Sequence, residues 1–261
     1  MIELANLTVS RGPRVVLNAL NLRLPPGEMI ALVGLNGAGK STLLETIAGA
    51  LPGYAGSCRV DGREVSAWQP RELGQRLAFL PQTAGRGSSV SGRQVVFMGR
   101  YPHSPGWKES PADAAAVDNA IRDAACEHLA HRSFATLSGG ERQRILLAAV
   151  LAQESPVMLL DEPAAHVDLP HQIEMYRLLR ERAAQGALCV AATHDLNLAA
   201  SFATRVLLLD GSQAVAFGSP EEVFTGDAFR SAFGPEVTVQ HDDGVVQITY
   251  RARARQERRA S

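Results

Sequence analysis

Residues 34–42 read Gly34-Leu35-Asn36-Gly37-Ala38-Gly39-Lys40-Ser41-Thr42, and this stretch fits the pattern G-x-x-x-x-G-K-[ST] at every fixed position. The pattern also occurs in unrelated loops, so its surroundings matter. An apolar run at residues 29–33 precedes it and is typical of a buried strand, and residues 41–50 favour a helix. In this context the loop amides and the helix N-terminus would bind phosphate oxygens. Lys40 would reach the β and γ phosphates, and the Ser41 hydroxyl would bind Mg²⁺.

The chain beyond this loop alternates between strand and helix patterns. Strands are predicted at residues 76–80, 157–160, 188–192 and 206–209, and helices at residues 169–184 and 196–203. Alternation of this kind is typical of βαβ units and a parallel sheet. Residues 2–9, 15–24 and the hairpin pattern at 57–65 predict further strands near the N-terminus. The fold class is therefore α/β: a P-loop NTPase core with a mixed, mainly parallel sheet and an N-terminal antiparallel β part.

An α-helical insert interrupts this alternation. From residue 85, loops rich in Gly, Ser and Pro surround a helical stretch with Ala114, Val117, Ile121 and Ala125 near a 3–4 spacing. We expect the insert at about residues 85–155 of a single domain spanning 1–250. Residues 237–240 and 245–250 predict one more hairpin. The tail, residues 251–261, has five Arg against one Glu and is expected to be a solvated, disordered terminus.

Composition narrows the range of functions. The 261 residues are 46% hydrophobic and 20% charged, with a formal net charge of −1, so charge favours neither nucleic acid nor an anionic membrane. Cys58, Cys126 and Cys189 form no CxxC pair and indicate buried hydrophobes in a reducing compartment. There is no signal-peptide pattern, and apolar runs are shorter than the roughly 18 residues of a membrane span. A cytoplasmic protein is predicted, peripheral if it serves a membrane.

Two carboxylates follow the apolar run at residues 157–160. Side chains at the carboxyl end of a strand in an open α/β sheet lie where ligands bind. Asp161 is then a candidate for the Mg²⁺ shell, and Glu162 for the base that accepts a proton from an attacking water. The alternative is that the chain simply emerges into water here. Taken alone, the pattern favours neither.

His194 and Gln82 occupy comparable positions. His194 follows the strand at residues 188–192, at the same predicted sheet edge as Asp161, which makes it a candidate to contact a γ-phosphate. A lone histidine is more often a surface or satisfied core residue. Gln82 follows the strand at residues 76–80, and its neutral amide suits a water or metal shell.

Leu137-Ser138-Gly139-Gly140-Glu141 opens a helix. Ser138 and Glu141 form a capping-box pattern, which by itself indicates only a good helix start. The glycines are unusual there, because each weakens a helix by about 1 kcal/mol. They are explained if the backbone must approach an anion closely.

Together, these motifs resemble the nucleotide-binding domain of ATP-binding-cassette (ABC) transporters, from residue 2 to about 225. The ordered set is GLNGAGKST, Gln82, LSGGE, LLDEP, Asp168 and His194. The resemblance implies an ATPase in which two domains enclose two ATP molecules head to tail, so that Ser138, Gly139 and Gly140 of one subunit cap the nucleotide bound by Lys40 of the other. Asp168 is then in the loop that joins the two sites. The implied catalytic residues are Glu162, His194 and Gln82, and the Mg²⁺ ligands are Ser41, Gln82 and Asp161. The implied ATP contacts are Arg11, Gly34, Leu35, Asn36, Gly37, Ala38, Gly39, Lys40, Ser41, Thr42, Ser138, Gly139, Gly140, Glu141 and Asp168.

A finer resemblance connects three stretches to ATPase subunits of importers for ferric siderophores, haem and cobalamin. They are VVFMGRYPH at residues 95–103, HDLNLA at 194–199 and GSPEEV at 218–223. The resemblance implies a homodimer on the cytoplasmic face of the cell membrane, attached to multi-span permease subunits and served indirectly by a substrate-binding protein. No nucleic acid is implied.

Several alternatives stay open at this stage. Soluble ABC ATPases act on ribosomes or chromosomes, although this chain has neither tandem P-loops nor long heptads, and a non-ABC kinase would leave residues 137–141 unexplained. The apolar run at residues 95–98 would contact the permease or belong to the insert's core. Arg11 stands where the family usually has an aromatic residue, so either its guanidinium stacks on adenine or a neighbour such as Val16 covers the base.

Overall fold

The computed structural model describes residues 1–82, 89–104, 109–242 and 245–250. Its strands are β1 (Ile2–Arg11), β2 (Arg14–Leu24), β3 (Met29–Val33), β4 (Tyr54–Val60), β5 (Arg63–Glu64), β6 (Leu77–Leu80), β7 (Val157–Asp161), β8 (Leu188–Ala192), β9 (Arg205–Asp210), β10 (Gln213–Gly218), β11 (Val237–Asp242) and β12 (Val245–Tyr250). Its α-helices are α1 (Lys40–Ile47), α2 (Pro70–Gly74), α3 (Gly92–Met98), α4 (Pro111–Asp123), α5 (Gly139–Ala152), α6 (Leu169–Ala184), α7 (Leu196–Phe202), α8 (Pro220–Thr225) and α9 (Asp227–Phe233).

The larger sheet places the phosphate loop at its centre. Its strand order is β10-β9-β3-β8-β7-β6, and β3 pairs in parallel with both β8 and β9. Every side chain of β3, β7 and β8 is buried, as expected for strands covered on both faces. β10 runs antiparallel to β9, so the sheet is mixed but mainly parallel. The predicted fold class is confirmed.

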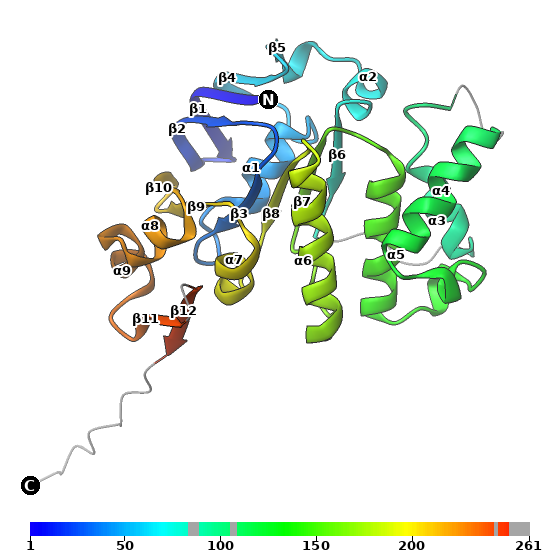
Figure 1. Ribbon diagram of the computed structural model, residues 1–261. Helices are drawn as coiled ribbons and strands as arrows, with labels where there is room; N and C mark the ends of the chain where they lie inside the picture. Colours follow the sequence, from blue (N-terminus) through cyan, green and yellow to red (C-terminus); the bar gives the residue numbers. More distant parts are fainter. Residues whose placement is uncertain (83–88, 105–108, 243–244, 251–261) are drawn as a thin grey trace, which may run out of the picture.

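Two layers cover the sheet. On one face, α1 and the antiparallel sheet β2-β1-β4-β5 pack against side chains such as Ile30 and Leu32 of β3. On the other face, α5 and α6 contribute to a second apolar core around Met29. Figure 1 shows the N-terminal strands on one side of the sheet and α6 and α7 on the other. Consecutive β3 residues thus serve opposite cores, as the alternation of a strand requires.

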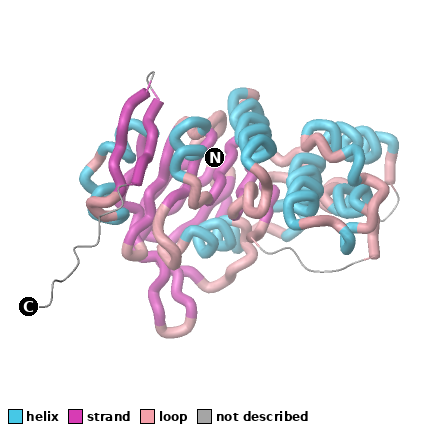
Figure 2. Tube along the Cα trace, turned by 90° about the horizontal axis from the view of Figure 1, so that it is seen from below, coloured by secondary structure: helices cyan, strands magenta, loops and turns pink. Residues whose placement is uncertain are grey.

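The helices α3, α4 and α5 stand together beside the sheet (Figures 1 and 2). Arg100, which follows α3, joins them: its buried guanidinium bonds to Asp113 of α4 at 2.9 Å and to the Ala152 carbonyl of α5 at 2.6 Å. Val95 and Val96 of α3 are buried in the core, so the core interpretation holds for them, whereas Met98 is 47% exposed.

Some boundaries differ from expectation. The predicted helix at residues 41–50 ends at Ile47 and is followed by Gly49 with φ +72°. Ala125 is not helical, because α4 ends at Asp123 and Ala125 has φ 49°. The basic tail, residues 251–261, lies outside the described residues. Within the described part of the chain, no helix has the length and apolar character needed to cross a membrane.

The cysteines behave as predicted. Cys58, Cys126 and Cys189 are all buried and free. Burial raises the pKa of each thiol to about 12, so the sulfur stays protonated and packs as a small apolar group.

Candidate functional site

The phosphate loop connects β3 to α1 in a conformation that requires glycine at two positions. A Cβ on Gly34 would lie 2.3 Å from the Leu209 carbonyl oxygen, and a Cβ on Gly39 would lie 2.6 Å from Leu17 Cδ2. Gly39 also has φ +103°, which other residues rarely adopt. These contacts hold the loop against the sheet while α1 begins at Lys40.

The Lys40 side chain crosses the loop instead of pointing into water. Its ammonium donates to the Gly34 carbonyl at 2.7 Å and to the Leu35 carbonyl at 3.3 Å, and the residue is 7% exposed. Burial lowers the pKa of Lys40, while the carboxylates of Glu162 and Asp161 oppose that shift. A cation is therefore held at the helix N-terminus, where both charge and helix dipole favour an anion.

A cavity of about 390 Å³ opens beside this loop. It brings together nine of the nineteen residues predicted for nucleotide binding, metal binding and catalysis. The lining residues are Val16, Asn36, Gly37, Gly39, Lys40, Ser41, Thr42, Gln82, Glu162 and His194. Gly34, Leu35 and Ala38 belong to the loop but do not line the cavity.

Asp161 lies at the carboxyl end of β7 and is 2% exposed. Among the described residues, its Oδ1 atom finds no hydrogen-bond partner. Burial raises the pKa of Asp161, and a bond from the Ser41 hydroxyl opposes this. An orphaned buried carboxylate oxygen beside a hydroxyl offers the oxygen ligands that Mg²⁺ prefers, with positions left for phosphate and water. The residues present fit a magnesium ion.

Glu162 and His194 both line the cavity and contact each other there. Their Oε1 and Nε2 atoms are 2.6 Å apart. Glu162 has φ 53°, a conformation that is uncommon for a residue other than glycine. Its N–H donates to the Ala192 carbonyl at 3.0 Å, and its own carbonyl accepts from the Gln143 amide at 3.4 Å. These backbone contacts fix the turn after β7 and bring the carboxylate to the cavity.

The Ser138 segment lies elsewhere. Ser138 caps α5: its N–H donates to Glu141 Oε2 at 2.7 Å, and the Glu141 N–H returns a bond to Ser138 Oγ. These bonds, with a contact from Arg132, lower the pKa of Glu141 to about 2. None of residues 138–141 lines the cavity, and neither does Asp168, which bonds to His171 at 2.5 Å.

The glycines of this segment have a partner that sequence reasoning missed. A Cβ on Gly140 would lie 2.9 Å from the His166 carbonyl oxygen, and one on Gly139 would lie 3.2 Å from His166 Cβ. Close packing within the chain therefore accounts for part of the requirement for glycine. The capping-box interpretation is confirmed for the helix start, and close approach to an anion stays a prediction.

Arg11 does not line the cavity, whereas Val16 does. The Arg11 guanidinium forms an ion pair with Glu45 of α1. Stacking of Arg11 on adenine stays a prediction. It requires the guanidinium to stack on the base while it is paired with Glu45, or to leave Glu45.

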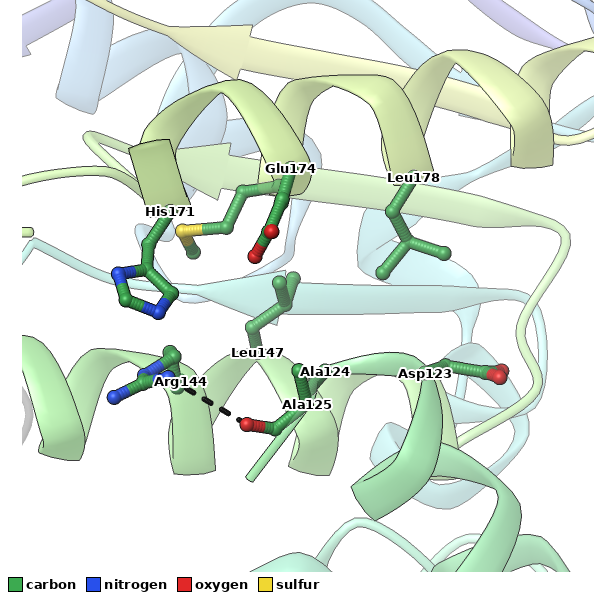
Figure 3. Close-up of a pocket in the computed structure, with 9 residues that line it drawn as sticks. Asp123, Ala124, Ala125, Arg144, Leu147, His171, Glu174 and Leu178 are labelled. Carbon is green, nitrogen blue, oxygen red and sulfur yellow. Dashed lines mark hydrogen bonds between the residues drawn. The ribbon is translucent and has the colours of Figure 1, made fainter. Parts of the chain in front are cut away.

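Two further cavities have lining residues that were not predicted. One, of about 170 Å³, is also lined by Glu162 and His194 and adds Tyr176. The other, of about 210 Å³, lies between α5 and α6. Figure 3 shows His171, Glu174 and Leu178 of α6 facing Arg144 and Leu147 of α5 across this second cavity. It shares no lining residue with the cavity beside Lys40, so we do not include it in the candidate site.

Comparison with known proteins agrees with this geometry. The sequence profile of the family described as "ABC transporter" matches residues 17–165. The hemin import ATP-binding protein HmuV of Pseudomonas entomophila is 41% identical over 245 residues, which cover 92% of this chain and 95% of that protein. HmuV of Streptomyces coelicolor is 45% identical over 233 residues, covering 89% and 83%. A solved structure of a metal-chelate type ABC transporter in an inward-facing conformation superimposes with a TM-score of 0.79 at 28% identity, covering 95% of this chain and 96% of the other. The chain belongs to the ABC transporter family, as an ATP-binding ATPase subunit.

Proposed function

We propose that this chain hydrolyses ATP to power import of haem through a separate membrane permease. The observation that carries the proposal is the match to haemin import proteins over about nine-tenths of the chain, at 41–45% identity in two organisms. The metal-chelate type of the structural neighbour supports the same substrate class. The cavity beside Lys40 supplies the groups that such an ATPase needs.

The described residues divide the chemistry as follows. Lys40 and the loop amides bind the phosphates. The positive charge of Lys40 and the N–H dipoles stabilise the negative charge of the phosphoryl group in the transition state. Ser41, Asp161 and Gln82 would hold Mg²⁺, which neutralises phosphate charge when bound. Glu162 accepts a proton from the attacking water. His194, whose Nε2 lies 2.6 Å from Glu162 Oε1, holds that carboxylate in position.

A head-to-tail homodimer explains where the remaining predicted residues lie. Ser138, Gly139, Gly140 and Asp168 do not line the cavity of their own chain. If they act on ATP, they act on nucleotide bound by a second subunit. The N-terminus of α5 then faces the phosphates of the partner's nucleotide, which is a favourable position for anion binding.

The permease is expected to contact the exposed surface at the end of α3. Met98 and Tyr101 are 47% and 67% exposed, an unusual degree for large apolar side chains so close together in sequence. Contact there would place the chain peripherally, on the cytoplasmic face of the membrane, with a substrate-binding protein on the other side.

Uptake by the reconstituted transporter tests the proposal. The chain is placed in vesicles together with a haemin-importer permease from the same organism, and uptake of haemin, a ferric siderophore and cobalamin is measured with ATP. Haemin should be transported, and Glu162→Gln should abolish transport. Glu181→Gln, an exposed acid on α6, is the matched control and should transport normally. Uptake of cobalamin or siderophore without haemin would reject haem as the substrate.

A further inference from the structure

The C-terminal hairpin is fastened to α7 by the side chain of Asn197. The Asn197 amide donates to the Ile248 carbonyl at 3.1 Å, and its oxygen accepts from the Ile248 N–H at 2.8 Å. One side chain thus satisfies both backbone groups of Ile248, as a neighbouring strand would. Figure 1 shows the hairpin, β11 and β12, beside α7.

Apolar packing strengthens this attachment. Val246 and Ile248 of β12 are 5% and 3% exposed and belong to a core cluster that also contains Leu196 and Ala199 of α7. His241 of β11 bonds to Glu221 of α8 at 2.8 Å. The hairpin therefore covers a face of α7 that would otherwise expose apolar side chains.

Helix α7 begins directly after His194, which lines the cavity beside Lys40. Asp195 caps α7, and its carboxylate accepts from the N–H groups of Asn197 at 3.0 Å and Leu198 at 2.9 Å. The Asp195 N–H donates to Thr193 Oγ1 at 3.0 Å. His194 stands between these two anchored residues. The backbone of Asn197 is thus connected to the His194 turn, while its side chain holds the hairpin.

Helix α7 is too short to be stable without tertiary contacts. A helix of seven residues is far below the length at which helices are stable alone, so its position depends on what packs against it. The imidazole of His194 is 46% exposed, and its Nε2 atom lies 2.6 Å from Glu162 Oε1. A shift of α7 would therefore move the His194 side chain relative to the Glu162 carboxylate.

We propose that Asn197 is a positioning residue, through which the C-terminal hairpin holds α7 and keeps His194 on Glu162. This role rests on the proposed ATPase mechanism and adds the hairpin to it. It also gives a physical reason for asparagine within the stretch HDLNLA, because few other side chains can both donate to and accept from one backbone residue.

Two variants of the full chain test this role. Asn197→Ala removes both bonds, whereas the isosteric Asn197→Asp keeps the acceptor but places a carboxylate against the Ile248 carbonyl. We expect Asn197→Ala to lower kcat about tenfold, equivalent to about 1.4 kcal/mol, with KM for ATP within about twofold, because Lys40 and its loop are unchanged. Asn197→Asp should lower kcat as well, because a carboxylate oxygen cannot donate to the Ile248 carbonyl and is repelled by it. The matched control is Thr249→Val, which removes a bond between β12 and β11 but leaves Asn197 intact.

A second readout does not depend on turnover. The side-chain NMR signal of His194, assigned with His194→Gln, should shift in both Asn197 variants and not in Thr249→Val. A normal His194 signal and normal kcat in Asn197→Ala, even with lower thermal stability, would reduce Asn197 to a structural role and overturn the inference. A wild-type protein without ATPase activity would instead reject the proposed function, and the NMR comparison would still decide the position of His194. If Asn197→Ala does not fold, Asn197→Asp decides by both readouts.

Discussion

Replacing Arg100 by methionine should destabilise the helices α3, α4 and α5 strongly. Arg100 is 6% exposed and connects all three: it follows α3, bonds to Asp113 of α4 and binds the Ala152 carbonyl at the end of α5. A third bond, of 2.7 Å, reaches Glu154. Methionine keeps most of the aliphatic volume, so the change removes mainly the charge and the donors.

The expected loss in the free energy of unfolding follows from the groups that lose their bond to Arg100. Asp113 is 4% exposed and, of its side-chain bonds with described residues, would keep those from Ser110 alone, while the Ala152 carbonyl would lose the Arg100 donor. Breaking a buried ion pair by removing one partner lowers the free energy of unfolding by about 3–5 kcal/mol. For a chain of this size, that corresponds to a Tm lower by roughly 6–20 °C.

The loss of stability in Arg100→Met should depend on pH. Bonds from Ser110 and the Arg100 guanidinium lower the pKa of Asp113 from 3.8 to about 2. The stabilisation from this carboxylate is therefore complete above its ordinary pKa and is lost as pH falls toward about 2. In Arg100→Met the pKa of Asp113 should rise, so the stability gap between the two proteins should narrow on acidification. It should not vanish, because Arg100 also binds the Ala152 carbonyl.

Thermal unfolding of the full chain, monitored by circular dichroism from neutral pH down to about pH 2, measures both effects, because the pKa of Asp113 in the folded wild type is about 2. Arg122→Met is the control, because Arg122 is exposed on α4 and, among the described residues, bonds only to Asn119 of the same helix. The control should melt within about 2 °C of wild type. If Arg100→Met melts as the control does, the buried network contributes little and the reasoning is wrong.

Five further experiments test the candidate site and its surroundings. Glu162→Gln should bind ATP and accumulate a nucleotide-bound dimer in size-exclusion chromatography without releasing phosphate, because an amide cannot accept the proton; wild-type turnover would contradict this. Lys40→Ala should weaken ATP binding about 10- to 150-fold in calorimetry, and a mixed dimer of Lys40→Ala with Ser138→Arg should keep hydrolysis that each homodimer lacks. Tyr176→Phe should leave the Tm unchanged or higher, because the Tyr176 hydroxyl is buried without a hydrogen-bond partner of good geometry among the described residues; a clear loss of stability would indicate bound water there. Arg11→Ala should change ATP affinity less than about threefold, since Glu45 already binds the guanidinium; a large loss would restore the stacking hypothesis.

Periodicity and turn chemistry predicted the sheet well. The short apolar runs that became β3, β7 and β8 are buried on both faces, and only a parallel sheet under two layers provides that environment. Because such strands end at one edge of the sheet, the sequence alone places the residues that follow them close together. Glu162 and His194 indeed meet at 2.6 Å.

Contacts between distant segments were harder to predict. Nothing local in the sequence indicates that Glu45 pairs with Arg11, because the two residues are 34 positions apart in the chain. Val16, in contrast, was named from the sequence as a candidate to cover the base, and it lines the cavity. The small helices α8 and α9 were missed as well. Their Phe224 and Phe229 rings pack at 5.1 Å in a cluster that is completed by residues far away in sequence.

Asn197 is a residue whose motif is recognisable in the sequence but whose bonding partner is not. Its motif could be matched to a family from the sequence, yet the reason for asparagine could not be given. The partner, Ile248, is 51 residues away and contributes only backbone atoms, so no complementary side chain marks it in the sequence. Specific side chains whose partners are backbone groups of remote segments therefore produce strong local motifs without a local explanation. In this chain, the motif that contains His194 also holds the terminal hairpin, so a family signature at an active site can include residues that never contact the nucleotide.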